Sequence, residues 1–261
     1  MIPNSVLSGI VFQMAIALLL PIILIIVFKK KKMLSWKSFG VGVLVFILFS
    51  QILEKILHYI VLAPSGTELK WTANPYCFAL YGGLAAGVFE EMGRFLAFKW
   101  LLKKNREYKD GLSLGLGHGG IEAILIGVLG GVNSLIMASL INSGKLDKLL
   151  GGGYSQEHIN LIKDQFIHQG FSMFAAGGIE RMFAIALQLA FSLLVLYGIR
   201  KSQFKFVIYA ILVHAGIDFL AAFYQAGLIK SIWPIEGFLA VIAVFAILFI
   251  VKMKPEFEKI N

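Results

Sequence analysis

Three ionisable side chains lie within one apolar stretch of the sequence, at Glu90, Glu91 and Arg94. The stretch extends from about Tyr76 to Leu102, and a helix that crosses a bilayer needs about 20 such residues. A charged side chain near the bilayer centre costs on the order of 3 kcal/mol on insertion scales. Two adjacent carboxylates also oppose each other's ionisation. The sequence therefore predicts polar partners for this group elsewhere in the chain.

Three apolar stretches each carry two ionisable residues four positions apart, a spacing that places both on one helix face. The pairs are Glu90 with Arg94, His118 with Glu122, and His214 with Asp218. Counting about 1.5 Å per residue from the predicted helix ends puts all three pairs in the middle to cytoplasmic half of the bilayer. Hydrogen bonds across a membrane bundle contribute only about 0.6 kcal/mol each. Packing alone is therefore a weak reason to bury these groups, and we expect one cavity to hold them.

The composition is that of an integral membrane protein. Of 261 residues, 58% are hydrophobic and 15% are charged, whereas a soluble domain carries about 25% charged residues. Mean hydropathy is +0.81. The single cysteine, Cys77, excludes an intramolecular disulfide and a cysteine-rich metal site. The net charge of +9 reflects the loops between apolar runs, and we expect no nucleic-acid partner.

Seven apolar runs predict an all-α protein with seven transmembrane helices. They are about Ser5–Phe28, Phe39–Leu62, Tyr76–Leu102, Gly111–Asn142, Gln169–Ile199, Phe206–Gln225 and Glu236–Val251. Sixteen Lys and Arg residues lie in the loops after the first, third and fifth runs and in the C-terminal tail, against five in the opposite loops. This bias predicts an external N-terminus and a cytoplasmic C-terminus. We expect one polytopic domain, residues 1–261, in a bacterial plasma membrane.

The long loop after the fourth run is predicted to be external. It contains Gly151-Gly-Gly153 and then a segment, Ser155–Phe166, predicted to form a short helix. Ile159 and Ile162 share one face of that helix with Phe166. The face either rests on the outer leaflet or covers the mouth of the bundle.

Other polar residues within the runs are expected to stabilise the bundle. We expect an ion pair and a contact within the bundle from Glu54, Lys55 and His58. We expect hydrogen bonds between helices from Gln51 and Gln188. The adjacent residues Glu180 and Arg181 cannot both face inward. Arg181 is expected to pair with a carboxylate of the central cluster.

Paired carboxylates with two imidazoles can activate water for hydrolysis. Burial and mutual repulsion make one carboxylate a competent base or acid near neutral pH, and a neutral His can share the proton. The same residue types bind zinc, with His118, His214 and Glu91 as the candidate ligands. A metal-independent mechanism is favoured, because Glu90 and Glu91 supply a base without a metal. The i,i+4 carboxylates suit orientation of the imidazoles at least as well as ligation.

The ordered set Glu90-Glu91-x-x-Arg94, His118 and His214-x-x-x-Asp218 resembles the glutamate-dependent intramembrane protease superfamily. That group includes the type II CAAX prenyl proteases, the bacteriocin-processing membrane proteins and the PrsW proteases. Within it, the chain looks most similar to the YhfC family of bacterial intramembrane metalloproteases. The resemblance covers about residues 76–225, which would form a four-helix catalytic core.

The resemblance implies that Glu90 and His118 activate the hydrolytic water. Glu91 and Arg94 would position them, while His214 and Asp218 would contact the carbonyl oxygen in the transition state. CAAX-type members space the arginine one residue further on, usually have Phe where Leu114 stands, and favour Asn over Asp218. Since an ionised Asp cannot donate a hydrogen bond, Asp218 is expected to orient His214, and Glu122 to orient His118.

The expected substrate is a membrane protein or a lipidated or hydrophobic peptide. Two alternatives come from other functional classes. Intramembrane carboxylates and His also serve as proton relays in ion-coupled carriers and channels, and the Gly-rich fourth run is compatible with a broken transporter helix. The polar motifs show no two-fold repeat, which argues against a carrier. The third reading is a non-catalytic membrane scaffold or immunity protein.

Overall fold

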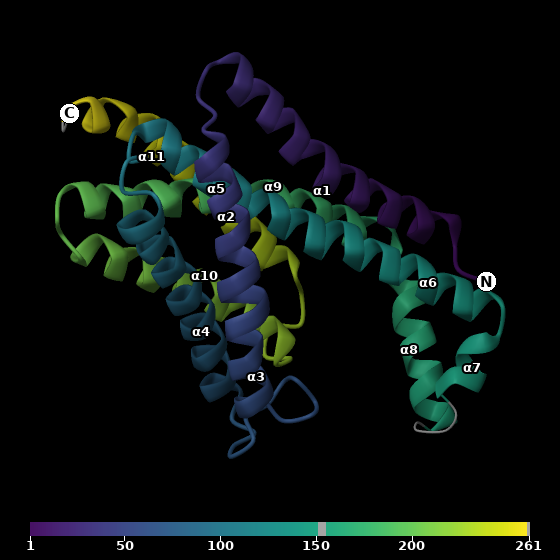
Figure 1. The fold of residues 1–261 in the computed structure, drawn as a ribbon. Helices are drawn as coiled ribbons and strands as arrows, with labels where there is room; N and C mark the ends of the chain where they lie inside the picture. The colour runs from purple at the N-terminus through teal and green to yellow at the C-terminus, as the bar shows by residue number, and fades with distance from the viewer. Residues whose placement is uncertain (151–154, 260–261) are drawn as a thin grey trace. The chain divides into compact units, whose positions relative to one another are not determined.

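The computed structural model describes residues 1–150 and 155–259, and these residues are almost entirely helical (Figure 1). The α-helices are α1 (Asn4–Lys30), α2 (Trp36–Val45), α3 (Lys55–Val61), α4 (Pro75–Leu96), α5 (Tyr108–Ala123), α6 (Gly130–Asn142), α7 (Lys145–Leu150), α8 (Gln156–His168), α9 (Gly170–Arg200), α10 (Lys205–Gln225) and α11 (Trp233–Glu258). Three π-helical segments continue them: η1 (Phe46–Glu54), η2 (Ala97–Leu101) and η3 (Ile124–Leu129). The predicted Gly151–Gly153 loop lies outside the described residues.

Six helical stretches in the described part of the chain are long and apolar enough to cross a membrane. They are Asn4–Lys30, Trp36–Val61, Tyr108–Asn142, Gly170–Arg200, Lys205–Gln225 and Trp233–Glu258. The protein is therefore an all-α, multi-pass membrane protein, as predicted. The seventh expected span corresponds to α4, which has 22 residues but carries the three charges of the opening motif. The count of seven and the orientation remain predictions.

Local sequence signals explain where α4 begins. The Asn74 side chain accepts hydrogen bonds from the backbone N–H groups of Tyr76 (2.9 Å) and Cys77 (3.3 Å). Pro75 occupies the first turn, where its missing N–H costs no helical hydrogen bond. Asn is among the strongest N-cap residues. This start sets the register that turns Glu90, Glu91 and Arg94 toward the buried face.

The chain forms two compact units, of which the first comprises Met1–Ile23 and Glu122–Met182. In this unit α1 lies along α6 (Figure 1). A Cβ atom at Gly131 would lie 2.3 Å from the Met14 side chain, so a larger residue there would force Met14 to move. Val6, Ile10 and Phe174 belong to the buried core.

The helix predicted at Ser155–Phe166 is present in this unit as α8. Ile159 on its apolar face is buried, and the Phe166 ring packs against Phe174 with centroids 6.0 Å apart. The apolar face is thus turned partly onto the protein, which favours the covering role over simple contact with the outer leaflet.

The second unit comprises Leu24–Ile121 and Phe183–Asn261. Within it, α4 packs most extensively against α10 and next against η1. A Cβ at Gly83 would lie 2.4 Å from the Ala215 backbone oxygen, and one at Gly87 would lie 2.7 Å from the Ile211 oxygen. Small residues on α4 therefore bring its backbone against α10.

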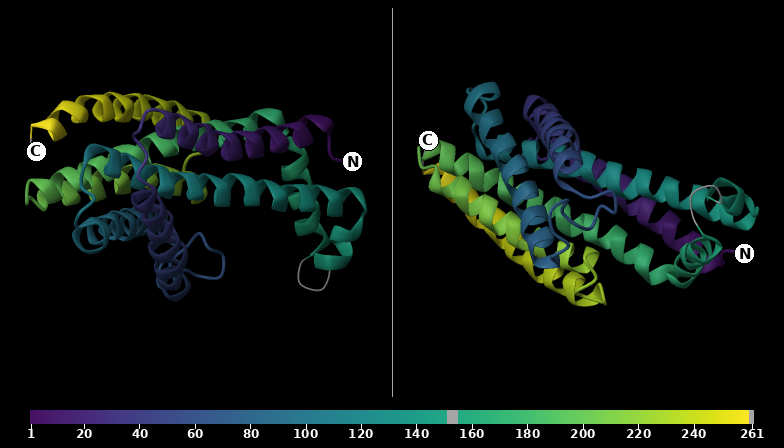
Figure 2. Two further views of the ribbon diagram at one scale, coloured as in Figure 1. Left: turned by 45° about the horizontal axis from the view of Figure 1, so that its top comes forward. Right: turned by 90° about the horizontal axis from the view of Figure 1, so that it is seen from below.

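Two further pairings complete the second unit. A Cβ at Gly117 on α5 would lie 2.0 Å from the Phe39 backbone oxygen on α2, so glycine also sets that crossing. The last helix, α11, lies along the end of α9 (Figure 2), where the rings of Tyr197 and Phe257 are 6.0 Å apart. Close packing within the second unit places α2, α4, α5, α9 and α10 around the polar residues of α4.

Candidate functional site

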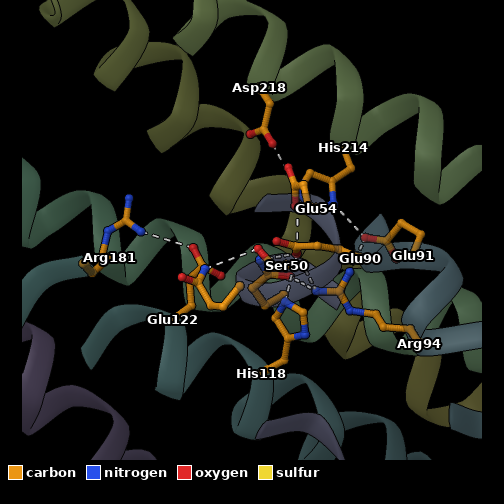
Figure 3. Close-up of polar contacts among 12 residues, drawn as sticks. Ser50, Glu54, Glu90, Glu91, Arg94, His118, Glu122, Arg181, His214 and Asp218 are labelled. Carbon is orange, nitrogen blue, oxygen red and sulfur yellow. Dashed lines mark hydrogen bonds and ion pairs between the residues drawn. The ribbon is translucent and has the colours of Figure 1, made fainter. Parts of the chain in front are cut away.

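Glu90, Glu91 and Arg94 of α4 meet His118 of α5 and His214 of α10 inside the second unit (Figure 3). All five side chains are buried. The structure therefore brings together the three motifs that the sequence placed on separate membrane helices. Their contacts form a single polar cluster in the interior of the unit.

Glu90 is the centre of the cluster. Its Oε2 atom lies 2.9 Å from Nε2 of His118. The same oxygen accepts hydrogen bonds from Arg94 Nη2 and from Gln188 Nε2, each at 3.3 Å. Side chains from three helices, α4, α5 and α9, thus converge on one carboxylate oxygen, which fixes its position relative to the imidazole of His118.

The Arg94 guanidinium neutralises the adjacent carboxylates. It pairs with both Glu90 and Glu91, and it also donates to the Gln188 side-chain oxygen. Arg94 is among the largest side chains that are fully buried in the protein. A buried charge needs such partners, because removing it from water costs several kcal/mol.

His214 is held on both ring nitrogens. Its Nδ1 lies 2.7 Å from Oε1 of Glu91. Its Nε2 lies 3.4 Å from Oδ2 of Asp218 and 3.9 Å from Oε2 of Glu90. The ring also stacks on Phe191, with centroids 4.9 Å apart and planes at 6°. The contact with Asp218 is compatible with the orienting role expected for that residue.

His118 differs from His214 in having one unpartnered nitrogen. Its Nε2 faces Glu90, whereas its Nδ1 is buried and has no hydrogen-bond partner in the described part of the chain. The Phe46 ring and the imidazole pack edge to face, with centroids 5.1 Å apart. An orphaned buried nitrogen calls for an explanation, such as a ligand, an ion or a water molecule.

Glu122 follows His118 by one turn on α5. Its Oε1 accepts a hydrogen bond from Nη1 of Arg181 at 3.1 Å (Figure 3). Arg181 therefore pairs with a carboxylate of the predicted site, as the sequence indicated. It pairs with the neighbouring Glu180 as well.

One group of side chains has the geometry to bind a metal ion. Glu90, His118 and Glu122 each offer a ligand atom, these atoms lie within 4.8 Å of one another, and all three residues are buried. Imidazole nitrogen and carboxylate oxygen are ordinary zinc ligands. The residues fit a divalent metal, although this set differs from the His118, His214 and Glu91 expected from the sequence.

A second polar chain lies on the second and third apolar runs. His58 bridges Glu54 and Tyr81: its Nε2 lies 3.3 Å from Oε1 of Glu54, and its Nδ1 lies 2.8 Å from the Tyr81 hydroxyl. The partner of Glu54 is therefore His58, while Lys55 is exposed. The contact between His58 and Tyr81 is the bundle contact that the sequence indicated.

Sequence reasoning missed two residues that shape the site. Gln188 was expected only to form a hydrogen bond within the bundle, yet it contacts both Glu90 and Arg94. Phe191 was not singled out at all, and it fixes the ring plane of His214. A lone Gln in an apolar run signals a polar partner, but a Phe in such a run carries no signal.

Comparisons with known proteins agree with the motif. The family described as "YhfC intramembrane metalloprotease" matches residues 16–239. The chain is similar to "Uncharacterized membrane protein YhfC" of Bacillus subtilis (strain 168), with 40% identity over 244 residues, which cover 94% of this chain and 95% of that protein. No solved structure matches the chain. The match covers most of the sequence and confirms the resemblance seen in the motifs, so the chain belongs to the YhfC family.

Proposed function

We propose that this protein hydrolyses a peptide bond in a membrane protein or another membrane-associated, hydrophobic peptide. The observation that carries the proposal is the contact of 2.9 Å between Glu90 Oε2 and His118 Nε2 within a buried cluster of two carboxylates, two imidazoles and one guanidinium. The family description, which names an intramembrane metalloprotease, supports the same reaction class. The catalytic core would be residues 76–225.

Glu90 is the base in this proposal. Its carboxylate accepts a proton from water as the water oxygen bonds to the carbonyl carbon of the substrate. The same proton then goes to the leaving nitrogen as the C–N bond breaks, which yields a carboxylate and an amine. His118, in contact with the same oxygen, shares the proton between the two steps. Positioned acid–base groups of this kind contribute about 10²–10⁴-fold to a rate.

His214 would act on the other side of the carbonyl group. Its Nδ1 contacts Glu91 and its Nε2 faces both Asp218 and Glu90. Nε2 lies 3.9 Å from Oε2 of Glu90, near the reacting atoms, and an N–H there would donate to the oxygen that becomes negative. Stacking on Phe191 keeps the ring in that plane. Asp218 is the positioning residue for His214.

Arg94 and Gln188 would preserve the geometry. Both donate to Oε2 of Glu90, so the carboxylate cannot rotate freely away from His118. Arg94 also compensates the charge of Glu91. A positioned carboxylate avoids reorganisation during the reaction, which is how buried polar sites stabilise developing charge.

The site also fits a divalent metal, which gives a second version of the proposed reaction in which Glu90 would hold the metal instead of acting as the base. Glu90, His118 and Glu122 would hold it, and the unpartnered Nδ1 of His118 is a further sign of a missing ligand. When bound, zinc would polarise a carbonyl oxygen and lower the pKa of water. This ligand group and the family description support the version with a metal, whereas the sequence alone favoured a metal-independent mechanism.

The test is a comparison of membrane proteomes from cells that carry the wild-type protein or Glu90→Ala. We expect a membrane protein to appear as shortened fragments with the wild type and at full length with the variant. Equal fragment patterns at equal protein levels would contradict the proposal. They would favour a non-catalytic scaffold that retains the cluster for packing.

A further inference from the structure

A cavity of about 420 Å³ lies at the end of the second unit where η2, the last turn of α9 and the first turns of α10 meet. Its apolar lining includes Phe95, Ile199, Phe204 and Val207, and its cations are Lys99 and Arg106. No acidic side chain lines it among the described residues. The cavity therefore combines positive charge with a hydrocarbon wall.

The guanidinium of Arg106 is fixed in place. Its Nε and Nη2 donate to the Phe98 backbone oxygen at 3.1 and 2.8 Å, and Nη2 also lies 3.2 Å from the Lys99 oxygen. The other terminal nitrogen, Nη1, has no hydrogen-bond partner in the ranges 1–150 and 155–259. One side of a rigid cation is thus left to bind an acceptor from a ligand.

Lys99 supplies a second, more mobile charge. Its Nζ lies 5.2 Å from the centre of the Phe95 ring, within the range of a cation–π contact. It forms no ion pair with a carboxylate of the described chain. An ammonium on a flexible stem can therefore reach an anion beside Arg106 without breaking a salt bridge.

The apolar wall of the cavity continues to the outside of the bundle. The rings of Phe95 and Phe204 meet edge to face with centroids 5.1 Å apart. Phe204 is 47% exposed, although Val207 beneath it is fully buried. A ligand in this cavity would meet hydrocarbon on one side and cations on the other, which is the arrangement at the phosphate of a membrane lipid.

The predicted topology gives this end of the helices to the cytoplasmic leaflet, which carries anionic lipids and attracts basic segments of membrane proteins. We propose that the cavity binds the phosphate of an anionic glycerophospholipid through Lys99 and Arg106, with an acyl chain against Phe95 and Phe204. Because α4 and α10 line both this cavity and the polar cluster, a bound lipid would also hold the ends of these two helices together.

The test uses the purified full-length protein in detergent and native mass spectrometry. Phosphatidylglycerol and phosphatidylcholine with identical acyl chains are compared, with glycerol phosphate as a soluble headgroup. We expect phosphatidylglycerol to bind more tightly than phosphatidylcholine, and glycerol phosphate not to displace it at equal concentration. Equal binding of the two lipids would overturn the proposal. Displacement by glycerol phosphate would instead indicate a soluble phosphate ligand and would overturn the lipid assignment.

Variants locate the site. Lys99→Gln should weaken phosphatidylglycerol binding about fivefold, the contribution of one basic residue near a lipid surface. Lys103→Gln removes the same charge four positions later, outside the cavity lining, and should have little effect. Gln203→Trp, at an exposed lining position, narrows the cavity without changing charge and should also weaken binding. If Lys103→Gln weakens binding as much as Lys99→Gln, the attraction is a general surface effect and the site is wrong. All readouts are binding, so they are independent of peptide hydrolysis.

Discussion

Nε2 of His118 lies 2.9 Å from Oε2 of Glu90, although 28 positions and a basic loop separate the two residues in the chain. The contact depends on close helix crossings. Gly117 lets α5 approach α2, and Gly83 and Gly87 let α4 approach α10. The small residues beside the polar motifs therefore act as spacers that bring the charges into one cluster.

Arg94 should be required for folding as well as for activity. Arg94→Met leaves Glu90 and Glu91 buried without their cation, and breaking a buried pair in this way costs about 3–5 kcal/mol. We expect a marked fall in the thermal unfolding temperature of the purified protein in detergent. Lys55→Met, which removes an exposed cation from another helix, serves as the control. Equal unfolding temperatures for the two variants would show that Arg94 does not stabilise the cluster.

The crossing of α4 and α10 can be tested at two neighbouring glycines. Gly83→Ala places a Cβ 2.4 Å from the Ala215 backbone oxygen, whereas Gly82→Ala meets only the Ala222 methyl group at 3.7 Å. Overpacking costs about 1–3 kcal/mol. We expect Gly83→Ala to lower the unfolding temperature and Gly82→Ala to leave it unchanged or raise it. The packing assignment fails if both substitutions behave alike.

Much of this arrangement could be predicted from the sequence because a membrane restricts the structures that can cross it. Long apolar runs become helices whose backbone groups are satisfied internally, and the observed ends lie within a few residues of the predicted ones, as at Gly111–Asn142 against Tyr108–Asn142. The i,i+4 spacing identified the polar faces. It also predicted that Glu90, His118 and His214 would meet.

Other features depend on packing that a single sequence does not reveal. Glu122 accepts a hydrogen bond from Arg181, a cation more than 50 residues later in the chain. Glu54 pairs with His58, four positions later on the same helix face, whereas Lys55 is exposed. Phe191 looks like any other apolar residue until its ring is seen against His214.

Chemical labelling tests the orientation predicted from the Lys and Arg bias. Cys77 is exposed and is first replaced by Ser, so that a single new cysteine reports each position. Cysteines at Ser65 and Ser155 should react with a membrane-impermeant thiol reagent in intact cells. Cysteines at Asn105 and Ser202 should react only after permeabilisation. Labelling of Asn105→Cys in intact cells would overturn both the orientation and the cytoplasmic placement of the lipid cavity.

Metal content separates the two versions of the proposed reaction. We expect purified wild-type protein to bind zinc, and His118→Ala or Glu122→Gln to lower its zinc content, because each removes a ligand of the group with Glu90. Asp218→Asn, which lies outside that group, is the control. A membrane-permeant chelator should remove activity and added zinc should restore it. Full activity in metal-free protein would show that Glu90 activates water without a metal.

The role of Glu54 and His58 provides a control for the catalytic assignment. Their polar chain is partly buried and ends at Tyr81, and the proposal gives it no part in the reaction. Glu54→Gln and His58→Ala should therefore keep at least about a tenth of the wild-type rate. Removal of an acid–base residue is expected to leave about a hundredth of that rate or less. If they lose as much as the cluster variants, the helices of the site are misassigned.

The most direct measurement uses the substrate identified by the comparison of membrane proteomes. Its cleavage by the purified enzyme is followed in a bilayer, in water enriched in ¹⁸O. With the wild type we expect one ¹⁸O in the new C-terminal carboxylate of the fragment, because the attacking oxygen comes from water. Glu90→Gln, His118→Ala and His214→Ala should each insert and accumulate normally, yet slow the labelled product by about 10²-fold or more. Cleavage by Glu90→Gln at the wild-type rate would contradict the assignment of Glu90 as the base.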